Sequence, residues 1–85
     1  MRTILVAQPS TMTLNDLQPH ASGIIEAIHA GQDLRRRLCG LGLRLGIRVH
    51  VVRRSPLNGP IQVRIGHTDL ILRRADAAHI EIAMA

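Results

Sequence analysis

Not one of the 85 residues is Phe, Trp or Tyr. The core of any fold must therefore be built from Ile, Leu, Val and Ala. A chain this short buries only about 60–65% of its extended surface on folding, so its core is thin. We expect one domain over residues 1–85, with a lead-in over residues 1–11 and a core over residues 12–84. The missing rings also argue against base stacking and against the aromatic-lined grooves that bind proline-rich peptides.

Hydrophobic periodicity predicts a mainly β fold. Apolar and polar residues alternate, or nearly so, in five short segments: residues 23–29, 47–52, 61–65, 69–73 and 79–84. In the first of them, Ile25 and Ile28 would face opposite sides of a regular strand, and a bulge would reconcile them. Short helical turns are expected over residues 12–17 and 74–78. The pattern predicts a small, strongly bent barrel of about five antiparallel strands with one or two short helices, because closure hides the strand edges.

A helix is predicted between the first two strands. Three leucines share one stripe of a helix over residues 32–41: Leu34, Leu38 and Leu41. We expect Asp33 to cap the amino end of this helix and Gly42 to end it. Arg35 and Arg36 point away from the leucine stripe, and Arg37 flanks it.

The sequence carries no motif of an enzyme. Nucleophile-elbow, P-loop, zinc-protease and dinucleotide-binding patterns are all missing. The glycines at 40, 42 and 46 lie at the carboxyl end of a helix, where carbonyl groups point outward, so they indicate a capping turn rather than a phosphate loop. The single cysteine, Cys39, excludes an internal disulfide and a Cys-x-x-Cys metal site. We therefore expect a protein that is not an enzyme and that requires no cofactor.

Two histidine–carboxylate pairs raise the question of a metal site. His79 and Glu81 point the same way from the last predicted strand, and His67 and Asp69 have the same spacing across a turn. Each pair supplies only half of a tetrahedral shell, so a second chain or exogenous ligands would have to complete it. Solvated surface residues are one interpretation. A weak divalent site for Fe²⁺ or Zn²⁺, bridging a homodimer, is the other.

The charge is strongly basic. Eleven arginines and no lysine stand against six acidic residues, for a formal net charge of +5. Such a surface favours nucleic acid, an acidic membrane face or an acidic protein as a partner. The arginines are spread along the chain without interleaved aromatic residues, so a nucleic-acid interface is allowed but not indicated. No apolar run reaches the length of a secretory signal or a membrane span, so we expect a cytoplasmic protein.

From the predicted helix onward, the sequence resembles the ferrous iron transport protein A family. The resemblance lies in Arg36-Arg37-Leu38-x-x-Leu41-Gly42-Leu43-x-x-Gly46, Val49-x-Val51-Val52-Arg53, Pro56-Leu57-x-x-Pro60-Ile61 with Val63, Leu70-Ile71-Leu72-Arg73 and Ile80-x-Ile82. Thr13-Leu14-x-x-Leu17 fits the opening of the family pattern. His20 and Leu45 stand where Gly and Pro are common, and Asn58-Gly59 reverses the usual Gly-Asp.

This resemblance implies a function that the residues alone do not show. Members of the family are SH3-like accessory proteins of bacterial ferrous iron uptake, thought to act on a membrane transporter that carries a GTP-hydrolysing domain. A related module occurs in metal-dependent repressors. The favoured hypothesis is a regulator of such a transporter that acts by protein–protein contact, peripheral to the inner membrane face. A metal-responsive dimerising module and a basic nucleic-acid-binding protein are the alternatives.

The expected contact surface combines two segments of the chain. The first is the arginine stretch on the predicted helix, and the second is a loop rich in proline with one apolar residue at its centre. Its residues are Arg35, Arg36, Arg37, Pro56, Leu57 and Pro60. An apolar residue beside charges suits an interface.

Overall fold

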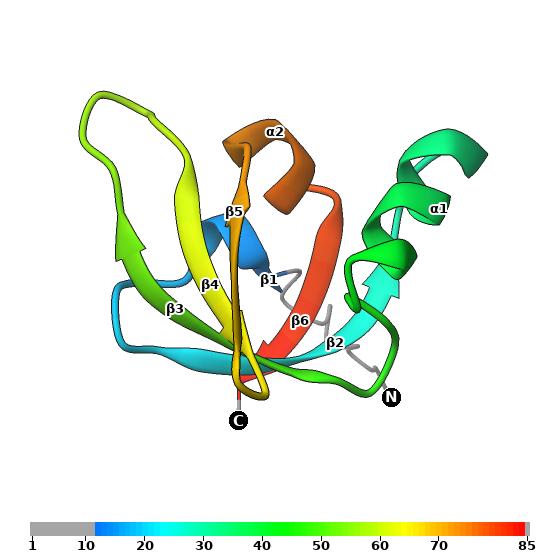
Figure 1. Ribbon diagram of the computed structural model, residues 1–85, viewed down its shortest axis with the longest axis horizontal. Coiled ribbons are helices and arrows are strands. Elements are labelled where there is room, and N and C mark those ends of the chain that lie inside the picture. Colours follow the sequence, from blue (N-terminus) through cyan, green and yellow to red (C-terminus); the bar gives the residue numbers. More distant parts are fainter. Residues whose placement is uncertain (1–11, 85) are drawn as a thin grey trace, which may run out of the picture.

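The computed structural model describes residues 12–84, and over these residues six antiparallel strands form one sheet in the order β1-β6-β2-β3-β4-β5 (Figure 1). The elements are, in chain order, β1 (Met12–Thr13), the 3₁₀ turn η1 (Leu14–Asp16), β2 (Ser22–Ile28), α1 (Gln32–Gly40), β3 (Arg48–Arg54), β4 (Ile61–Ile65), β5 (Thr68–Leu72), α2 (Arg74–Ala77) and β6 (Ile80–Met84). The mainly β prediction is confirmed. The lead-in over residues 1–11 lies outside the described residues.

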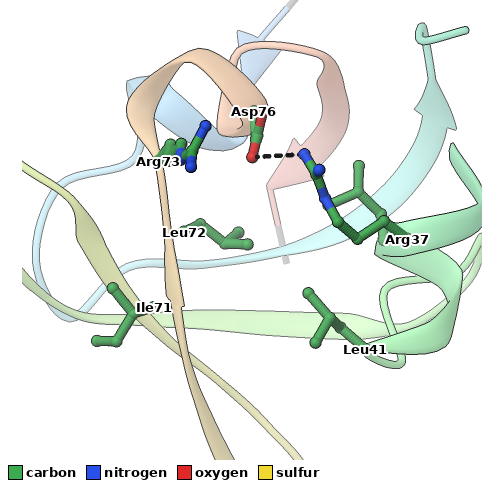
Figure 2. Close-up of a pocket in the computed structure, with 7 residues that line it drawn as sticks. Arg37, Leu41, Ile71, Leu72, Arg73 and Asp76 are labelled. Carbon is green, nitrogen blue, oxygen red and sulfur yellow. Dashed lines mark hydrogen bonds and ion pairs between the residues drawn. The ribbon is translucent and has the colours of Figure 1, made fainter. Parts of the chain in front are cut away.

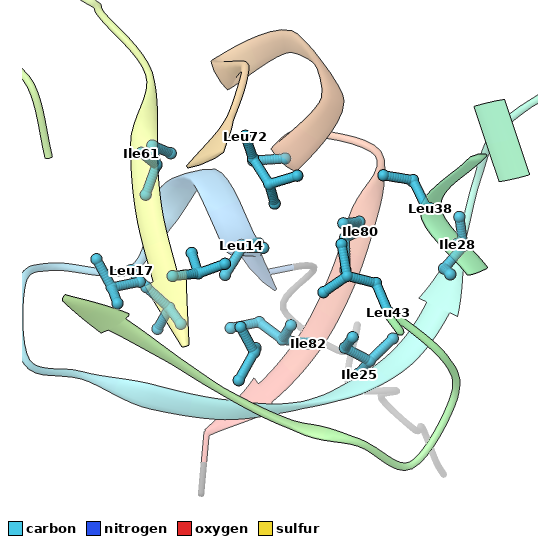
Figure 3. Packing of buried hydrophobic residues seen from close by; sticks show 14 residues of the cluster. Leu14, Leu17, Ile25, Ile28, Leu38, Leu43, Ile61, Leu72, Ile80 and Ile82 are labelled. Atoms are coloured by element: carbon cyan, nitrogen blue, oxygen red, sulfur yellow. The ribbon is translucent and has the colours of Figure 1, made fainter. Parts of the chain in front are cut away.

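The sheet curls around an aliphatic interior (Figure 3). Alternate residues of the central strands face inward, and Val49, Val51 and Val63 have no exposed surface. Leu14 of η1 is also fully buried and points into the same interior as Leu72 and Ile80. Over residues 12–84 no polar or charged residue is buried. The core of the described residues is therefore purely aliphatic, as a chain without Phe, Trp or Tyr requires.

The predicted bulge in β2 is confirmed. The pairing of β2 with β6 shifts by one residue between Ile25 and Ala27. Because of this shift, Ile25 and Ile28 are both buried, with 1% and 4% of their surface exposed. A second shift, between Val51 and Arg53 of β3, was not predicted.

Two strand predictions need correction. Residues 12 and 13 were expected to belong to a helical turn, but they form the strand β1, in which Met12 pairs with Ile82 of β6. A strand of two residues is too short to show an alternating pattern in the sequence. The last strand begins at Ile80, so His79 lies in the turn after α2 rather than on the strand.

Of the two predicted ends of α1, the Gly42 stop is confirmed and the Asp33 N-cap is wrong. Gly31 occupies the N-cap position, and Asp33 instead lies in the first turn, where its charge favours the helix dipole. At the other end Gly42 has a φ of +100°, as predicted for a helix stop. Its N–H donates to Cys39 O at 3.0 Å, and that of Leu43 donates to Leu38 O at 3.0 Å. This pair of bonds is the Schellman motif, which satisfies the last carbonyl groups of the helix.

Candidate functional site

α2 links the two segments that the sequence analysis combined into one surface. Arg37 Nη2 of α1 lies 3.4 Å from Asp76 Oδ2 of α2. Arg74 Nη1 of α2 donates a hydrogen bond to Asn58 Oδ1 in the loop between β3 and β4. The loop, α2 and α1 consequently follow one another along the upper side of the molecule in Figure 1.

A groove of about 270 Å³ lies between α1, β5 and α2 (Figure 2). We call it the helical groove, and its lining residues are Arg37, Leu38, Leu41, Ile71, Leu72, Arg73 and Asp76. Leu38 and Leu72 are buried, whereas Leu41 and Ile71 expose 42% and 66% of their surfaces. The groove thus combines four apolar side chains with two guanidinium groups and one carboxylate.

The position of Leu41 corrects the predicted leucine stripe. Leu38 is buried and Leu34 is partly buried, but Leu41 lies at the edge of the helical groove with much of its side chain exposed. α1 ends at Gly40, so Leu41 is the C-cap residue of the helix rather than the last member of a helical stripe. The sequence analysis therefore missed Leu41, Ile71 and Asp76 as surface residues. The sequence shows only that leucine and isoleucine occur at these positions. Which of them are exposed depends on the packing.

The three arginines of α1 have different surroundings. Arg35 Nη2 donates to Ile28 O at 2.7 Å, which ties the helix to the end of β2. Arg37 pairs with Asp76 across the helical groove. Arg36 is exposed. Arg36 and Arg37 therefore remain the arginines of α1 best placed to meet a partner, whereas Arg35 has a structural contact.

Leu57 stands at the tip of the loop with 97% of its surface exposed. It and Asn58 have φ values of +58° and +61°, the left-handed region. Gly59 N donates to Pro56 O at 3.1 Å, and Ser55 N donates to Pro60 O at 3.1 Å, so the turn is closed twice. A left-handed leucine costs about 1–2 kcal/mol. The fold thus holds an apolar side chain in water on a strained backbone, and such backbone strain is often found at functional positions.

The histidine–carboxylate pairs form different contacts from those expected. Glu81 Oε1 lies 2.7 Å from His29 Nε2, while His79 Nδ1 donates to the carbonyl oxygen of His29 at 2.8 Å. Asp69 accepts from Arg64 Nε at 2.6 Å, and this hydrogen bond holds the pKa of Asp69 below its ordinary value. Within residues 12–84, no three His, Cys, Asp or Glu side chains converge as a metal site would require.

The model of the FeoA domain family matches residues 12–84 of the chain. The chain belongs to the FeoA family. The resemblance seen in the sequence is thereby confirmed, and ferrous iron transport is the process with which this family is associated. Neither helix between residues 12 and 84 has the length and apolar character needed to cross a bilayer.

Three similar proteins place the FeoA chain in context. A Fe(2+) transport protein A/Fe(2+) transporter FeoB fusion protein of Porphyromonas gingivalis is 32% identical over 73 residues, 86% of this chain and only 9% of the fusion protein. FeoA of Stenotrophomonas maltophilia in complex with zinc, described as a prokaryotic SH3 domain protein, is 33% identical, with a TM-score of 0.73 over 85% of this chain and 89% of that one. The predicted SH3-like fold is therefore confirmed.

The third is a manganese-dependent transcriptional repressor in complex with manganese. It is 22% identical, with a TM-score of 0.83 over 92% of this chain and 38% of the repressor. At this identity the likeness shows a shared fold alone.

Proposed function

We propose that this chain is a cytoplasmic, non-enzymatic accessory protein of ferrous iron uptake that binds the cytosolic G-protein-like domain of a membrane ferrous iron transporter. One observation carries the proposal: a homologous segment is joined to the transporter FeoB within one chain of Porphyromonas gingivalis. Fusion keeps two domains at a high effective concentration, which favours partners that act together.

The helical groove and Leu57 supply the contact surface for this proposal. Protein interfaces commonly have an apolar centre, and arginine is enriched in them. Leu41 and Ile71 provide exposed apolar area, and Arg36, Arg37 and Arg73 surround it with positive charge. The net charge of +5 favours an acidic face on the transporter and proximity to the anionic inner leaflet.

Binding of the purified protein to the transporter in nanodiscs, followed by interferometry at physiological salt with and without guanine nucleotide, tests the proposal. Ile71→Asp places a charge in the helical groove, and we expect it to weaken binding at least about tenfold, since one buried charge costs more than 1.4 kcal/mol. Leu45→Asp is the matched control, because Leu45 is 62% exposed and lies outside the groove. Equal binding by both variants would contradict the proposed surface, and retention on duplex DNA instead would favour a nucleic-acid role.

A divalent-ion site is the second candidate function. The zinc complex of the Stenotrophomonas relative favours it, and here His29, His79 and Glu81 lie at the same end of β2 and β6. A bound ion would have to replace the His29–Glu81 contact and recruit ligands from a second copy. Sedimentation with Zn²⁺ or Fe²⁺ tests this: a dimer in the wild type that is lost in His79→Ala supports the site. The His67 and Asp69 pair is less favoured, because Arg64 already binds the carboxylate.

A further inference from the structure

The register of the sheet places four polar side chains in one line across β2, β3, β4 and β5. Ser22 pairs with His50, His50 pairs with Arg64, and Arg64 pairs with Asp69. Directly opposed residues of antiparallel strands point to the same face of the sheet. We call these four residues the polar row: Ser22, His50, Arg64 and Asp69. They face away from the core, because Val49, Val51 and Val63, their neighbours along β3 and β4, are fully buried.

Hydrogen bonds hold the members of the polar row in fixed orientations. Ser22 Oγ and His50 Nδ1 are 2.8 Å apart and partly buried. Arg64 donates to Asp69 twice, from Nε at 2.6 Å and from Nη2 at 3.2 Å. Gln62 Nε2 donates to the same carboxylate at 3.1 Å. The imidazole and the guanidinium group are therefore positioned before any ligand arrives, which lowers the entropy cost of binding.

An open depression of about 570 Å³ lies over three of the four residues of the polar row. It is lined by Ser22, Arg48, His50, Arg64 and Gly66. Arg48 lies two residues before His50 on β3 and so points to the same face of the sheet. The lining contains two guanidinium groups, an imidazole and a hydroxyl group, and no carboxylate belongs to it.

We propose that this depression binds the phosphate group of a phosphorylated small molecule or lipid. Arg48 can bind phosphate oxygens with paired, charge-assisted hydrogen bonds. Arg64 adds its Nη1 group, because its Nε and Nη2 groups already donate to Asp69. The hydrogen bond between Ser22 and His50 uses one proton of that pair, so the pair supplies one further donor to a tetrahedral anion. Because the chain has no Phe, Trp or Tyr as a platform for a base, the proposed recognition is limited to the phosphate. The site lies on strands and shares no residue with the helical groove, so it is independent of the proposed transporter contact.

NMR titration of the ¹⁵N-labelled protein with inorganic phosphate, at an ionic strength held constant with sodium chloride, tests this site. We expect saturable shifts confined to the amides of Ser22, Arg48, His50 and Gly66. Arg48→Gln should weaken binding about five- to tenfold, the effect of losing one charge-assisted contact in an exposed site. Arg53→Gln is the matched control, since Arg53 is another exposed arginine of β3 outside the depression. Shifts that never saturate, or that are equal in both variants, would exclude free phosphate as the ligand and leave only a lipid headgroup to test.

A parallel arm identifies the source of the phosphate. Vesicles of phosphatidylcholine with phosphatidic acid present the same group on a lipid surface, and co-sedimentation measures binding. Arg48-dependent binding to inorganic phosphate indicates a small-molecule ligand, and Arg48-dependent binding to the vesicles alone indicates a headgroup. Failure of both probes refutes the site.

Ser22→Ala tests whether the orientation of His50 contributes to binding. The change keeps every charge of the depression but removes the hydrogen bond that orients His50, so phosphate affinity should fall only about two- to threefold.

Discussion

The helical groove and the polar row differ in what holds their side chains in place. α1, one wall of the groove, has a single buried residue, Leu38, and its link to α2 is an exposed ion pair at 3.4 Å. The polar row instead lies on four strands that are neighbours in one hydrogen-bonded sheet, and each of its residues pairs directly with the next. The backbone ladder therefore fixes the row, whereas few side-chain contacts fix the groove.

This difference suits the two surfaces to different partners. A wall that few contacts hold can shift to admit side chains of a protein partner, since weakly packed elements open at low free energy. A rigid line of polar groups matches a small anion, for which misplacement of a donor by an ångström is costly. The predictions below test this contrast through the stability of each region.

The largest effect is expected at Leu38. Leu38→Ala should lower the free energy of unfolding by about 2–5 kcal/mol, because the side chain is 1% exposed and is the only buried residue of α1. Urea denaturation followed by circular dichroism measures the loss. Native-state hydrogen exchange should show faster opening of α1 while β3 keeps its protection. Leu45→Ala, at an exposed leucine, is the control and should change stability by less than about 0.5 kcal/mol. A loss below about 1 kcal/mol for Leu38→Ala would show that other contacts hold α1.

Two glycines at the end of α1 give the next largest effect. Gly42→Ala should cost about 1–2 kcal/mol, because φ is +100° and the added Cβ would lie 2.9 Å from Ile65 Cδ1. Gly40→Ala should instead stabilise by up to about 1 kcal/mol, since nothing lies within 4 Å of the new methyl group. Thermal unfolding of both variants measures the contrast. Equal changes of the same sign would show that the helix stop does not anchor the groove wall.

Local pattern predicted the scaffold of this fold well. Alternation around Val49 and Val63 identified β3 and β4, and the mismatch between Ile25 and Ile28 identified the bulge, because burial and pleat are local properties of a strand. Gly42 was also predicted correctly as a helix stop, because the left-handed conformation that ends a helix is a local preference of glycine.

The functional surfaces were much harder to predict. His29 meets Glu81 across 52 positions of sequence, and the polar row depends on the register of four strands, which no short segment encodes. Leu41 was predicted to belong to the leucine stripe of the helix, but it is the exposed C-cap residue, and its exposure depends on tertiary packing. Both candidate surfaces therefore came into view only when distant elements were brought together.

Leu57 gives a test in which the expected change in stability is smaller and of opposite sign to that of Leu38→Ala. Leu57→Gly should leave stability unchanged or raise it by about 0.5 kcal/mol, because glycine relieves the left-handed strain at φ +58° but adds entropy to the unfolded chain. The same change removes the exposed side chain, so binding to the transporter should fall. Denaturation and binding measured on one preparation separate the two effects. A clear loss of stability would instead give Leu57 a structural role and weaken its place in the interface.

The smallest effect is expected at Asp69, and it tests whether the ladder or the ion pair fixes the polar row. The hydrogen bond from Arg64 lowers the pKa of Asp69, so the ionised carboxylate favours the folded state above its unfolded pKa of about 3.9. This contribution is lost as the pH falls through the lower pKa of the folded state. The difference in urea midpoint between the wild type and Asp69→Asn should therefore be small at pH 6 and vanish near pH 2.5. A difference independent of pH would contradict the ion pair.

The same variant tests what holds the polar row in place. If the backbone hydrogen bonds between the strands fix the row, Asp69→Asn should keep the phosphate-induced shifts at Ser22 and His50. Loss of these shifts would show that Arg64 needs the carboxylate of Asp69 to stay in place.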